Sequence, residues 1–290
     1  MRILSLGKQF RPNTSHVYPP FTYGRYMEEY VYDYLLIHAA SMADNMVYIP
    51  IFWTNLQNHP GFSKMKSAYH ILLQRAIHEL HDSNVRYFTV VQHDDGPQLD
   101  LPPHTIIFGA CTGTIPLPLL YEDTRNTLLS SKRLQKDILA SFIGSMTHPV
   151  RDAMCAAFMG HDDIFFQGKK GWTHQVPDSL ADQFIHYTLR SKFCLAPRGY
   201  GRSSFRFFEA ILLDTIPVYI WDDVCWLPYQ DSIDYSTFSV CISSNDIHRL
   251  HDILTGISEE TYERMRDALQ KIRPMFTLQA MCEYIVSYCS

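Results

Sequence analysis

Short apolar runs suited to β-strands alternate with longer segments that have the apolar spacing of amphipathic helices, along most of the 290-residue chain. The expected strands are Met1–Leu6, Val47–Phe52, Tyr87–Gln92, Thr105–Gly109, Ile138–Gly144, Ile164–Phe166, Lys192–Ala196 and Ile216–Trp221. The expected helices are Tyr26–Met42, Ser67–His81, Pro149–Met159, Pro177–Ser191, Ser203–Leu213, Glu259–Arg273 and Thr277–Tyr288. This alternation predicts an α/β fold, because parallel strands need crossover connections that are usually helical.

The strand and helix pattern forms two successive series, which predict two Rossmann-like lobes with parallel sheets. Residues 1–130 are expected to form the first lobe and residues 131–275 the second. Residues 276–290 are expected to form a C-terminal helix that packs back on the first lobe.

The charge balance and composition exclude several classes of protein. Net charge is -5, without the basic stripe of a nucleic-acid binder. No apolar run approaches the roughly 18 residues that span a bilayer, and the start lacks a secretory leader, so no membrane anchor is expected. The seven cysteines form no CxxC pair, which predicts reduced thiols and a cytoplasmic protein.

The segment from Ser191 to Asp223 has the order strand, glycine loop, helix, strand. The glycines allow backbone N–H groups to approach a ligand closely, and a serine can cap the helix, whose N-terminus attracts anions. Arginines surround the same helix start and can hold a diphosphate through charge-assisted hydrogen bonds. The candidate anion-binding residues of this loop are Arg198, Gly199, Gly201, Arg202, Ser203, Ser204 and Arg206.

Helical spacing separates two faces of the helix that follows the loop. Phe205, Phe208 and Leu212 are expected to pack on the sheet. Arg206 and Glu209, three residues apart, share another face, where Glu209 could accept hydrogen bonds from ribose hydroxyls. The alternative is an ordinary ion pair on the helix surface.

The glycine loop also permits a second interpretation. Residues 199–204 read Gly-Tyr-Gly-Arg-Ser-Ser, which is close to the GxGxxG fingerprint, and Asp222 and Asp223 follow about 20 residues later. An NAD(P)-dependent oxidoreductase that uses the Gly199-x-Gly201 loop is therefore the main rival function. A bulky Tyr and Arg inside the loop and the missing third glycine weaken it. A non-catalytic nucleotide- or sugar-binding module is a third possibility.

The order of residues in this segment resembles the exostosin family (GT47) of glycosyltransferases. The matching residues read S-x-FCL-x-PRG at 191–199, S-x-R-x-x-EA at 204–210 and IPV at 216–218. Weaker matches lie elsewhere in the chain: Ala43-Asp44 with Pro50, a "HDWGP"-like turn at 93–97 in which Asp95 replaces tryptophan, Gly144 with Arg151, and residues 246–257.

The resemblance implies a GT-B fold, with a cleft between the lobes, the nucleotide sugar on the C-terminal lobe and the acceptor on the N-terminal lobe. It implies inverting transfer from a UDP-sugar to a glycan, which forms a β-linkage without a metal or a tightly bound cofactor. Donors in the family include xylose, glucuronate, galactose and arabinose, and xylose is slightly favoured here. The lack of an anchor resembles short soluble members found in large algal viruses.

These features give a hypothesis for the donor site. Arg198 and Arg206, with backbone N–H groups of residues 201–204, hold the diphosphate and stabilise its charge as it leaves. Arg151 completes this clamp, Glu209 binds the ribose, and residues from Tyr219 to Asp223, Asp222 among them, line the base or sugar pocket.

An inverting transfer also needs a base for the acceptor hydroxyl. Asp94 is the first candidate, because it follows a predicted strand and α/β sheets bind ligands at the carboxyl ends of strands. His93 is the second candidate and Glu29 the third. The alternative is that residues 93–96 form only a turn.

Two acidic clusters invite a metal interpretation. His161-Asp162-Asp163 and Asp222-Asp223 lack the ligand spacing of zinc or facial-triad sites, so solvated turns and no metal are expected.

Overall fold

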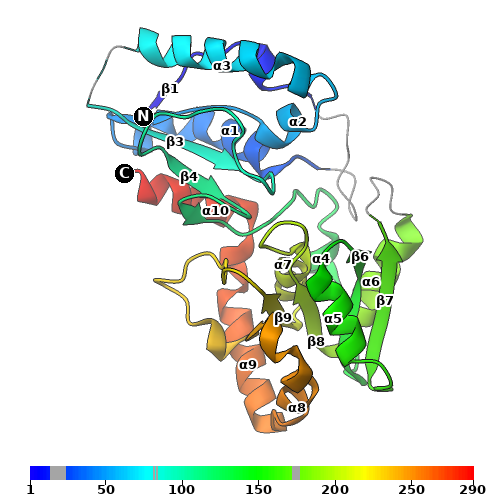
Figure 1. The fold of residues 1–290 in the computed structure, drawn as a ribbon. Helices are drawn as coiled ribbons and strands as arrows, with labels where there is room; N and C mark the ends of the chain where they lie inside the picture. The colour runs from blue at the N-terminus through cyan, green and yellow to red at the C-terminus, as the bar shows by residue number, and fades with distance from the viewer. Residues whose placement is uncertain (14–23, 81, 83, 172–176) are drawn as a thin grey trace. The chain divides into compact units, whose positions relative to one another are not determined.

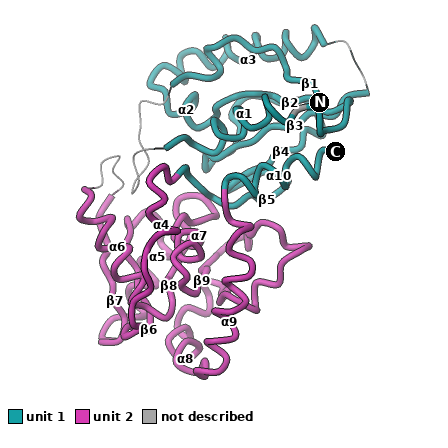
Figure 2. Tube along the Cα trace, turned by 180° about the vertical axis from the view of Figure 1, so that it is seen from behind, with its two compact units in different colours: residues 1–16, 24–122, 278–290 teal, residues 17–23, 123–277 magenta. Residues whose placement is uncertain are grey.

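The computed structural model describes residues 1–290 except 14–23, 81, 83 and 172–176 (Figure 1). The chain divides into two compact units (Figure 2). The described residues of unit 1 lie within 1–16, 24–122 and 278–290, and those of unit 2 lie within 123–277.

Unit 1 contains a parallel sheet in the order β1-β2-β3-β4-β5. Its strands are β1 (Arg2–Ile3), β2 (Met46–Tyr48), β3 (Arg86–Val91), β4 (Ile106–Gly109) and β5 (Ile115–Pro116). Its helices are α1 (Met27–His38), α2 (Trp53–Gln57), α3 (Phe62–Glu79) and α10 (Leu278–Tyr288), with the short 3-10 turns η1 (Lys8–Phe10) and η2 (Ala39–Ser41).

Successive side chains along the strands of unit 1 point to opposite faces of the sheet, and helices pack on both faces. Val47 packs in one cluster with Leu73 of α3. On the other face, the Phe108 ring meets the Tyr288 ring of α10 edge to face, with centroids 5.4 Å apart. Because helices cover both faces, the strands are apolar throughout, as is typical of parallel sheets.

Unit 2 contains a second parallel sheet, in the order β10-β9-β8-β6-β7. Its strands are β6 (Ile138–Met146), β7 (Ile164–Lys170), β8 (Ser191–Pro197), β9 (Ile216–Trp221) and β10 (Val240–Ser243). Its helices are α4 (Thr127–Ser130), α5 (Pro149–Ala157), α6 (Asp178–Arg190), α7 (Phe205–Leu212), α8 (Leu250–Thr255) and α9 (Glu259–Ile272), with the 3-10 turns η3 (Tyr235–Thr237), η4 (Ser244–Arg249) and η5 (Arg273–Phe276).

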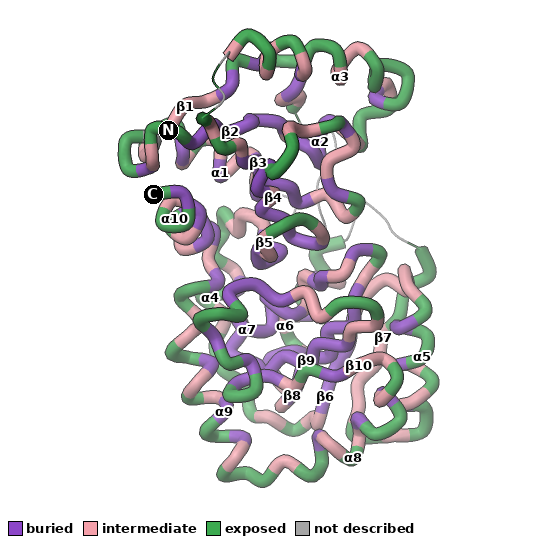
Figure 3. The backbone as a smooth tube through the Cα atoms, turned by 60° about the vertical axis from the view of Figure 1, so that its left-hand side comes forward, coloured by how far each residue is buried: buried purple, intermediate pink, exposed green. Residues whose placement is uncertain are grey.

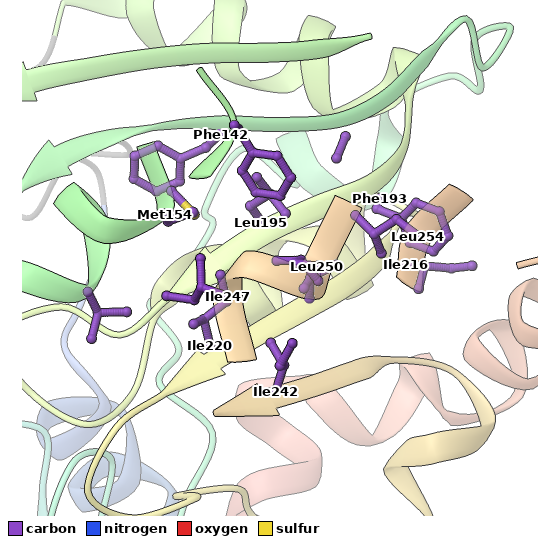
Figure 4. Packing of buried hydrophobic residues seen from close by; sticks show 14 of the residues in the cluster. Phe142, Met154, Phe193, Leu195, Ile216, Ile220, Ile242, Ile247, Leu250 and Leu254 are labelled. Atoms are coloured by element: carbon purple, nitrogen blue, oxygen red, sulfur yellow. The ribbon is translucent and has the colours of Figure 1, made fainter. Parts of the chain in front are cut away.

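One face of this sheet packs against α5, η4, α8 and α9. Leu195 and Phe193 of β8 share a buried cluster with Met154 of α5 and with Leu250 and Leu254 of α8 (Figure 4). Buried residues follow β8 and β9 as they do β3 and β4 of unit 1 (Figure 3). The helices α6 and α7 lie on the opposite face, where the Arg206 guanidinium lies 3.9 Å from the centroid of the Phe184 ring.

The predicted fold class, two Rossmann-like lobes with parallel sheets, is confirmed in these two units. β9 has the predicted bounds, and β7 is longer than predicted because it pairs with β6 as far as Lys170. The elements β5, β10, α2, α4 and α8 were not predicted, because each is too short to show a periodic apolar pattern in the sequence.

The C-terminal helix α10 packs on unit 1, where the Ala43 N–H donates to the Cys289 carbonyl at 3.0 Å. Among the described residues, no helix combines the length and the hydropathy needed to cross a membrane.

The predicted apolar face of α7 is wrong in two of its three positions. Phe207, Phe208 and Ile211 are buried, whereas Phe205 and Leu212 are only partly buried. The reason is that Phe207 packs edge to face on Tyr219 of β9, with centroids 5.7 Å apart, which turns the helix relative to the predicted stripe.

We expect Leu195→Ala to lower the free energy of unfolding by about 2–5 kcal/mol, because a fully buried leucine leaves a cavity when truncated. The matched control, Leu134→Ala in the same unit, removes a side chain that is 41% exposed and should change stability by less than about 0.5 kcal/mol. Urea denaturation followed by circular dichroism measures both values. Equal losses would contradict the assignment of the core.

Candidate active site

The topology of unit 2 determines where a ligand site can form. In chain order the strands are β6 to β10, and their spatial order has β7 on one side of β6 and β8 on the other. This is the doubly wound 2-1-3-4-5 arrangement, in which ligands bind outside the carboxyl ends of the two strands at the switch point. The switch point lies between β6 and β8, and the loop that carries the predicted donor residues begins directly after β8.

Arg151 of α5 lies at the switch point and binds backbone carbonyls there. Its Nε donates to the Arg198 carbonyl at 3.0 Å, and its Nη2 donates to the Pro197 carbonyl at 3.3 Å. Its Nη1 donates to the carbonyl of Ser145 on β6. The guanidinium therefore joins the ends of β6 and β8, and direct contact with a diphosphate stays a prediction.

The start of α7 has the geometry of an anion-binding helix terminus. Ser204 is the N-cap residue, with φ -144° and ψ 127°, but its side chain makes no capping hydrogen bond. The Ser204 Oγ is buried and has no hydrogen-bond partner among the described residues. Because a buried hydroxyl without a partner is costly, this atom is a candidate contact for a ligand.

The loop between β8 and α7 is closed by its own backbone. The Gly199 N–H donates to the Ser203 carbonyl at 3.3 Å, and Gly201 and Ser203 are buried. A Cβ at Gly199 would lie 3.2 Å from a terminal nitrogen of Arg151, so a side chain here would have to shift the Arg151 guanidinium by a few tenths of an ångström. The close approach therefore favours glycine at this position.

Arg198 is almost buried and binds two carboxylates at the end of β9. Its Nη1 donates to Asp222 Oδ1 at 2.5 Å and to Asp223 Oδ1 at 2.8 Å. Its Nη2 donates to the Tyr200 carbonyl at 2.8 Å. The two aspartates that resembled the acidic part of a dinucleotide fingerprint are thus paired with the arginines of the loop.

Asp223 has a second arginine partner, Arg202, whose Nε donates to Asp223 Oδ2 at 2.7 Å. Burial opposes the ionisation of Asp223, but hydrogen bonds from Arg202 and the Val224 N–H and the charge of Arg198 outweigh it and hold the pKa at about 2. Asp223 is therefore ionised at neutral pH.

Arg206 and Glu209 form the expected pair one turn apart on α7, with Glu209 buried and Arg206 partly buried. Arg206 Nη1 pairs with Glu209 Oε2, and the Glu209 side chain is only 2% exposed. Arg206 Nε also donates to the Ile143 carbonyl of β6 at 2.7 Å. A buried pair fixed to the sheet differs from the solvent-exposed pair of the alternative interpretation.

Tyr219 is buried, and its hydroxyl supports the loop. The hydroxyl donates to the Arg202 carbonyl at 2.6 Å and accepts from the Trp226 N–H at 3.3 Å. This places Tyr219 beneath the arginine loop, and its predicted contact with the base or the sugar stays a prediction.

His148 belongs to the same site and was not predicted from the sequence. Its Nδ1 accepts from the Val150 N–H at 3.3 Å, so it caps α5, and its Nε2 lies 3.6 Å from Asp222 Oδ2. Burial and the charge of Arg198 lower the pKa of His148. The sequence signal was its position between the predicted strand 138–144 and the helix that Pro149 opens.

The second predicted group lies in unit 1, directly after β3. Asp94 Oδ1 accepts from the Cys111 thiol at 3.1 Å, and His93 Nδ1 accepts from the Asp95 N–H at 3.2 Å. Gly96 has φ 71° and closes the turn with a hydrogen bond to the His93 carbonyl at 3.0 Å. Burial lowers the pKa of His93, so its imidazole is neutral at neutral pH.

Glu28 of α1 is a fully buried carboxyl that supports this turn and was not predicted. Its Oε1 accepts from the Gln92 N–H at 2.8 Å, and its Oε2 accepts from the Thr54 N–H at 2.9 Å. Burial raises the pKa of Glu28 to about 7. The neighbouring Glu29 accepts from the Tyr26 N–H at 3.0 Å, so it binds the backbone just before α1.

A family comparison matches the part of the chain that carries the predicted donor residues. The model of the Exostosin GT47 domain matches residues 108–257, which is more than half of the chain and runs from β4 to the end of α8. The chain belongs to the exostosin GT47 family. The resemblance read from the 191–218 segment is thereby confirmed.

Individual relatives of this exostosin-family chain are named as glycosyltransferases. A probable glycosyltransferase of Arabidopsis thaliana is 28% identical over 237 residues, which are 76% of this chain and 45% of that protein. The probable glucuronosyltransferase GUT1 of Oryza sativa subsp. japonica is 38% identical over 80 residues, which are 28% of this chain and 19% of the relative. The chain therefore spans less than half the length of these relatives.

Among solved structures, TarM has a TM-score of 0.42 and 10% identity, with 89% of this chain and 57% of TarM covered. At this score the two folds are only loosely similar. The names of the relatives give no support to the oxidoreductase alternative.

The raised pKa of Glu28 predicts a specific dependence of stability on pH. Between the ordinary pKa of 4.5 and the folded value of about 7, the folded chain keeps a proton that the unfolded chain has lost. The free energy of unfolding therefore falls as pH rises through this range, by up to about 3 kcal/mol from this group.

We expect Glu28→Gln to remove this contribution, so that stability falls less between pH 4.5 and 7 in the variant than in the wild type. Urea denaturation at several pH values measures the difference. Glu79→Gln, which changes an exposed glutamate on α3, is the control and should parallel the wild type. Parallel curves for Glu28→Gln would contradict the assignment.

Proposed function

We propose that this exostosin-family chain is an inverting glycosyltransferase, which moves a sugar from a UDP-sugar to a hydroxyl of a glycan and forms a β-linkage. The observation that carries the proposal is the cluster at the switch point of unit 2. There, buried arginines, the N-terminus of α7 and the Ser204 hydroxyl, which has no partner in the described part of the chain, lie at the carboxyl ends of β6 and β8.

The diphosphate of the donor supplies the charge that this cluster would bind. Arg198 and Arg206 are each held by carboxylates and carbonyls, so their guanidiniums are oriented before a ligand arrives. Oriented donors stabilise charge that develops on a leaving group without reorganisation at the moment of reaction. In our proposal they take the role that a metal ion has in other transferases.

Contact with the diphosphate requires exchange of partners at Arg198. Asp222 and Asp223 occupy its Nη1, and a phosphoryl oxygen can replace one of them without loss of charge pairing. Glu209, paired with Arg206, is the carboxylate that we assign to the ribose. The pair would place ribose and phosphate contacts one helical turn apart.

For the acceptor step we propose Asp94 as the general base. It takes the hydroxyl proton while the acceptor oxygen attacks the anomeric carbon and UDP leaves with the bonding electrons. His93 is less suited, because a neutral imidazole that accepts at Nδ1 carries its proton on Nε2 and has no lone pair there. Asp94 lies on a turn that Glu28 fixes through the neighbouring Gln92.

We assign the donor sugar to the group that the family resemblance implies: xylose, glucuronate, galactose or arabinose, with xylose slightly favoured. The rice relative is named a probable glucuronosyltransferase, so UDP-glucuronate is the first donor to compare with UDP-xylose. A thermal-shift panel with UDP, the four UDP-sugars and NADH tests the donor class, because a ligand of the native state raises the melting temperature. A shift with NADH and none with UDP would overturn the proposal.

Arg206→Ala should lower kcat/KM for the UDP-sugar by about 100-fold or more, since one oriented donor to a developing charge is worth a few kcal/mol. Because this change leaves Glu209 buried and unpaired, Arg206→Ala with Glu209→Gln is measured beside it, and circular dichroism checks folding. Arg249→Ala, which truncates an exposed arginine of η4, is the control. A loss of less than about tenfold in both Arg206 variants would remove Arg206 from the diphosphate role.

Asp94→Asn should keep the thermal shift with the donor and lose sugar transfer to a glycan acceptor, because the amide cannot take a proton at neutral pH. Asp95→Asn changes the exposed neighbouring carboxylate and should transfer normally. Transfer is measured as labelled sugar in the glycan product. Normal turnover by Asp94→Asn would eliminate this residue as the base.

A further inference from the structure

A cluster of two histidines and one aspartate lies apart from the arginine site of unit 2. Its members are His161, in the turn after α5, Asp163, directly before β7, and His251, in α8. The ligand atoms of all three lie within 4.8 Å of one another. His251 Nε2 lies 3.2 and 3.1 Å from the two carboxylate oxygens of Asp163.

The cluster lies at the amino ends of the strands, opposite the carboxyl ends that carry the proposed donor residues. Asp163 precedes the amino end of β7, whereas the arginine loop follows the carboxyl end of β8, and both strands run parallel to β6. A ligand at His161, Asp163 and His251 would therefore act on the fold of unit 2 and not on the sugar.

The protein core holds the elements that carry the three side chains. Phe158, just before the turn, and Leu250, just before His251, are buried in the same apolar cluster. Figure 4 shows Leu250 within this cluster. The Leu139 N–H donates to the Asp163 carbonyl at 2.9 Å, and the His161 N–H donates to the Phe158 carbonyl at 3.2 Å. The side chains are thus brought together by packing that exists without any ion.

The set of side chains matches the chemistry of a transition metal. Two imidazole nitrogens and a carboxylate oxygen are common zinc ligands, with metal–ligand distances of about 2.0–2.2 Å. Tetrahedral geometry with such distances puts neighbouring ligand atoms about 3.4 Å apart, close to the separation of His251 Nε2 and Asp163. The rings of His161 and His251 are stacked, with centroids 3.9 Å apart and an interplanar angle of 30°. Imidazole lone pairs lie in the ring plane, so one ring must rotate out of this stack for both to bind the same ion, within the 4.8 Å that already separates the ligand atoms.

We propose that His161, Asp163 and His251 form a binding site for a divalent transition-metal ion, with Zn²⁺ as the preferred ion and water as the fourth ligand. The ion fastens α8 to the turn before β7 and stabilises unit 2. The sequence shows only His161-Asp162-Asp163, and the third ligand lies 88 residues beyond Asp163, so no spacing motif reveals the site.

The test uses the full chain without a histidine tag. The protein is treated with EDTA to remove bound metal, and the EDTA is then removed. Zn²⁺ is added in competition with a chromophoric chelator to obtain stoichiometry and Kd, and the melting temperature is measured with and without Zn²⁺. We expect one ion per chain and a rise in melting temperature on the order of 5 °C at an excess of about 100 times Kd. His161→Ala and His251→Gln should each weaken binding at least tenfold and remove most of the rise.

His248→Ala and Cys241→Ser are the controls, because both residues are exposed and lie outside the cluster in the same unit. They should bind Zn²⁺ as the wild type does. Unchanged binding in His161→Ala and His251→Gln, or a loss of binding in Cys241→Ser alone, would overturn the proposal. Absence of binding in the wild type, at Zn²⁺ concentrations that saturate the chelator, would also overturn it.

Discussion

The guanidinium of Arg151 makes the connection on which the proposed donor site depends. Parallel strands at a switch point send their chains to opposite faces of the sheet, so their last carbonyls lack the partners that a continuing ladder supplies. Arg151 donates to the carbonyls of Ser145, Pro197 and Arg198, and so satisfies the ends of β6 and β8 together. A lysine could not do this equally well, because its donors do not form a planar fork.

Above this connection, positive and negative charges are nearly balanced. Arg198 and Arg202 pair with Asp222 and Asp223, and Arg206 pairs with Glu209. Buried arginines without such partners would be costly, and the carboxylates also fix the direction of each guanidinium. An anion that takes the place of one carboxylate keeps Arg198 paired, and the displaced carboxylate, Asp222 or Asp223, is partly exposed to solvent. The lowered pKa of His148 leaves that side chain neutral beside Arg198 and adds no further positive charge.

Local sequence patterns predicted the elements of the fold well, and they predicted the partners of the side chains poorly. β9 and the segment 191–212 could be predicted because apolar runs, glycines and capping residues act within a few residues. The predicted apolar face of α7 was wrong because Phe207 packs on Tyr219 of the following strand, a contact that the local sequence does not reveal. Glu28 and His251 were missed because their partners, Gln92 and Asp163, are 64 and 88 residues away in the chain.

Both units support their strand ends with a buried ionisable side chain, a base in unit 2 and an acid in unit 1. In unit 2 the Arg151 guanidinium donates to carbonyls after β6 and β8, and in unit 1 the Glu28 carboxyl accepts from the Thr54 and Gln92 amides after β2 and β3. An arginine keeps its charge at every physiological pH, whereas Glu28 has its pKa raised to about 7 and changes charge there. The amides of Thr54 and Gln92 bind the ionised carboxylate more strongly than the neutral acid. The support of the turn that carries Asp94 therefore changes near neutral pH, whereas the guanidinium of Arg151 keeps its charge.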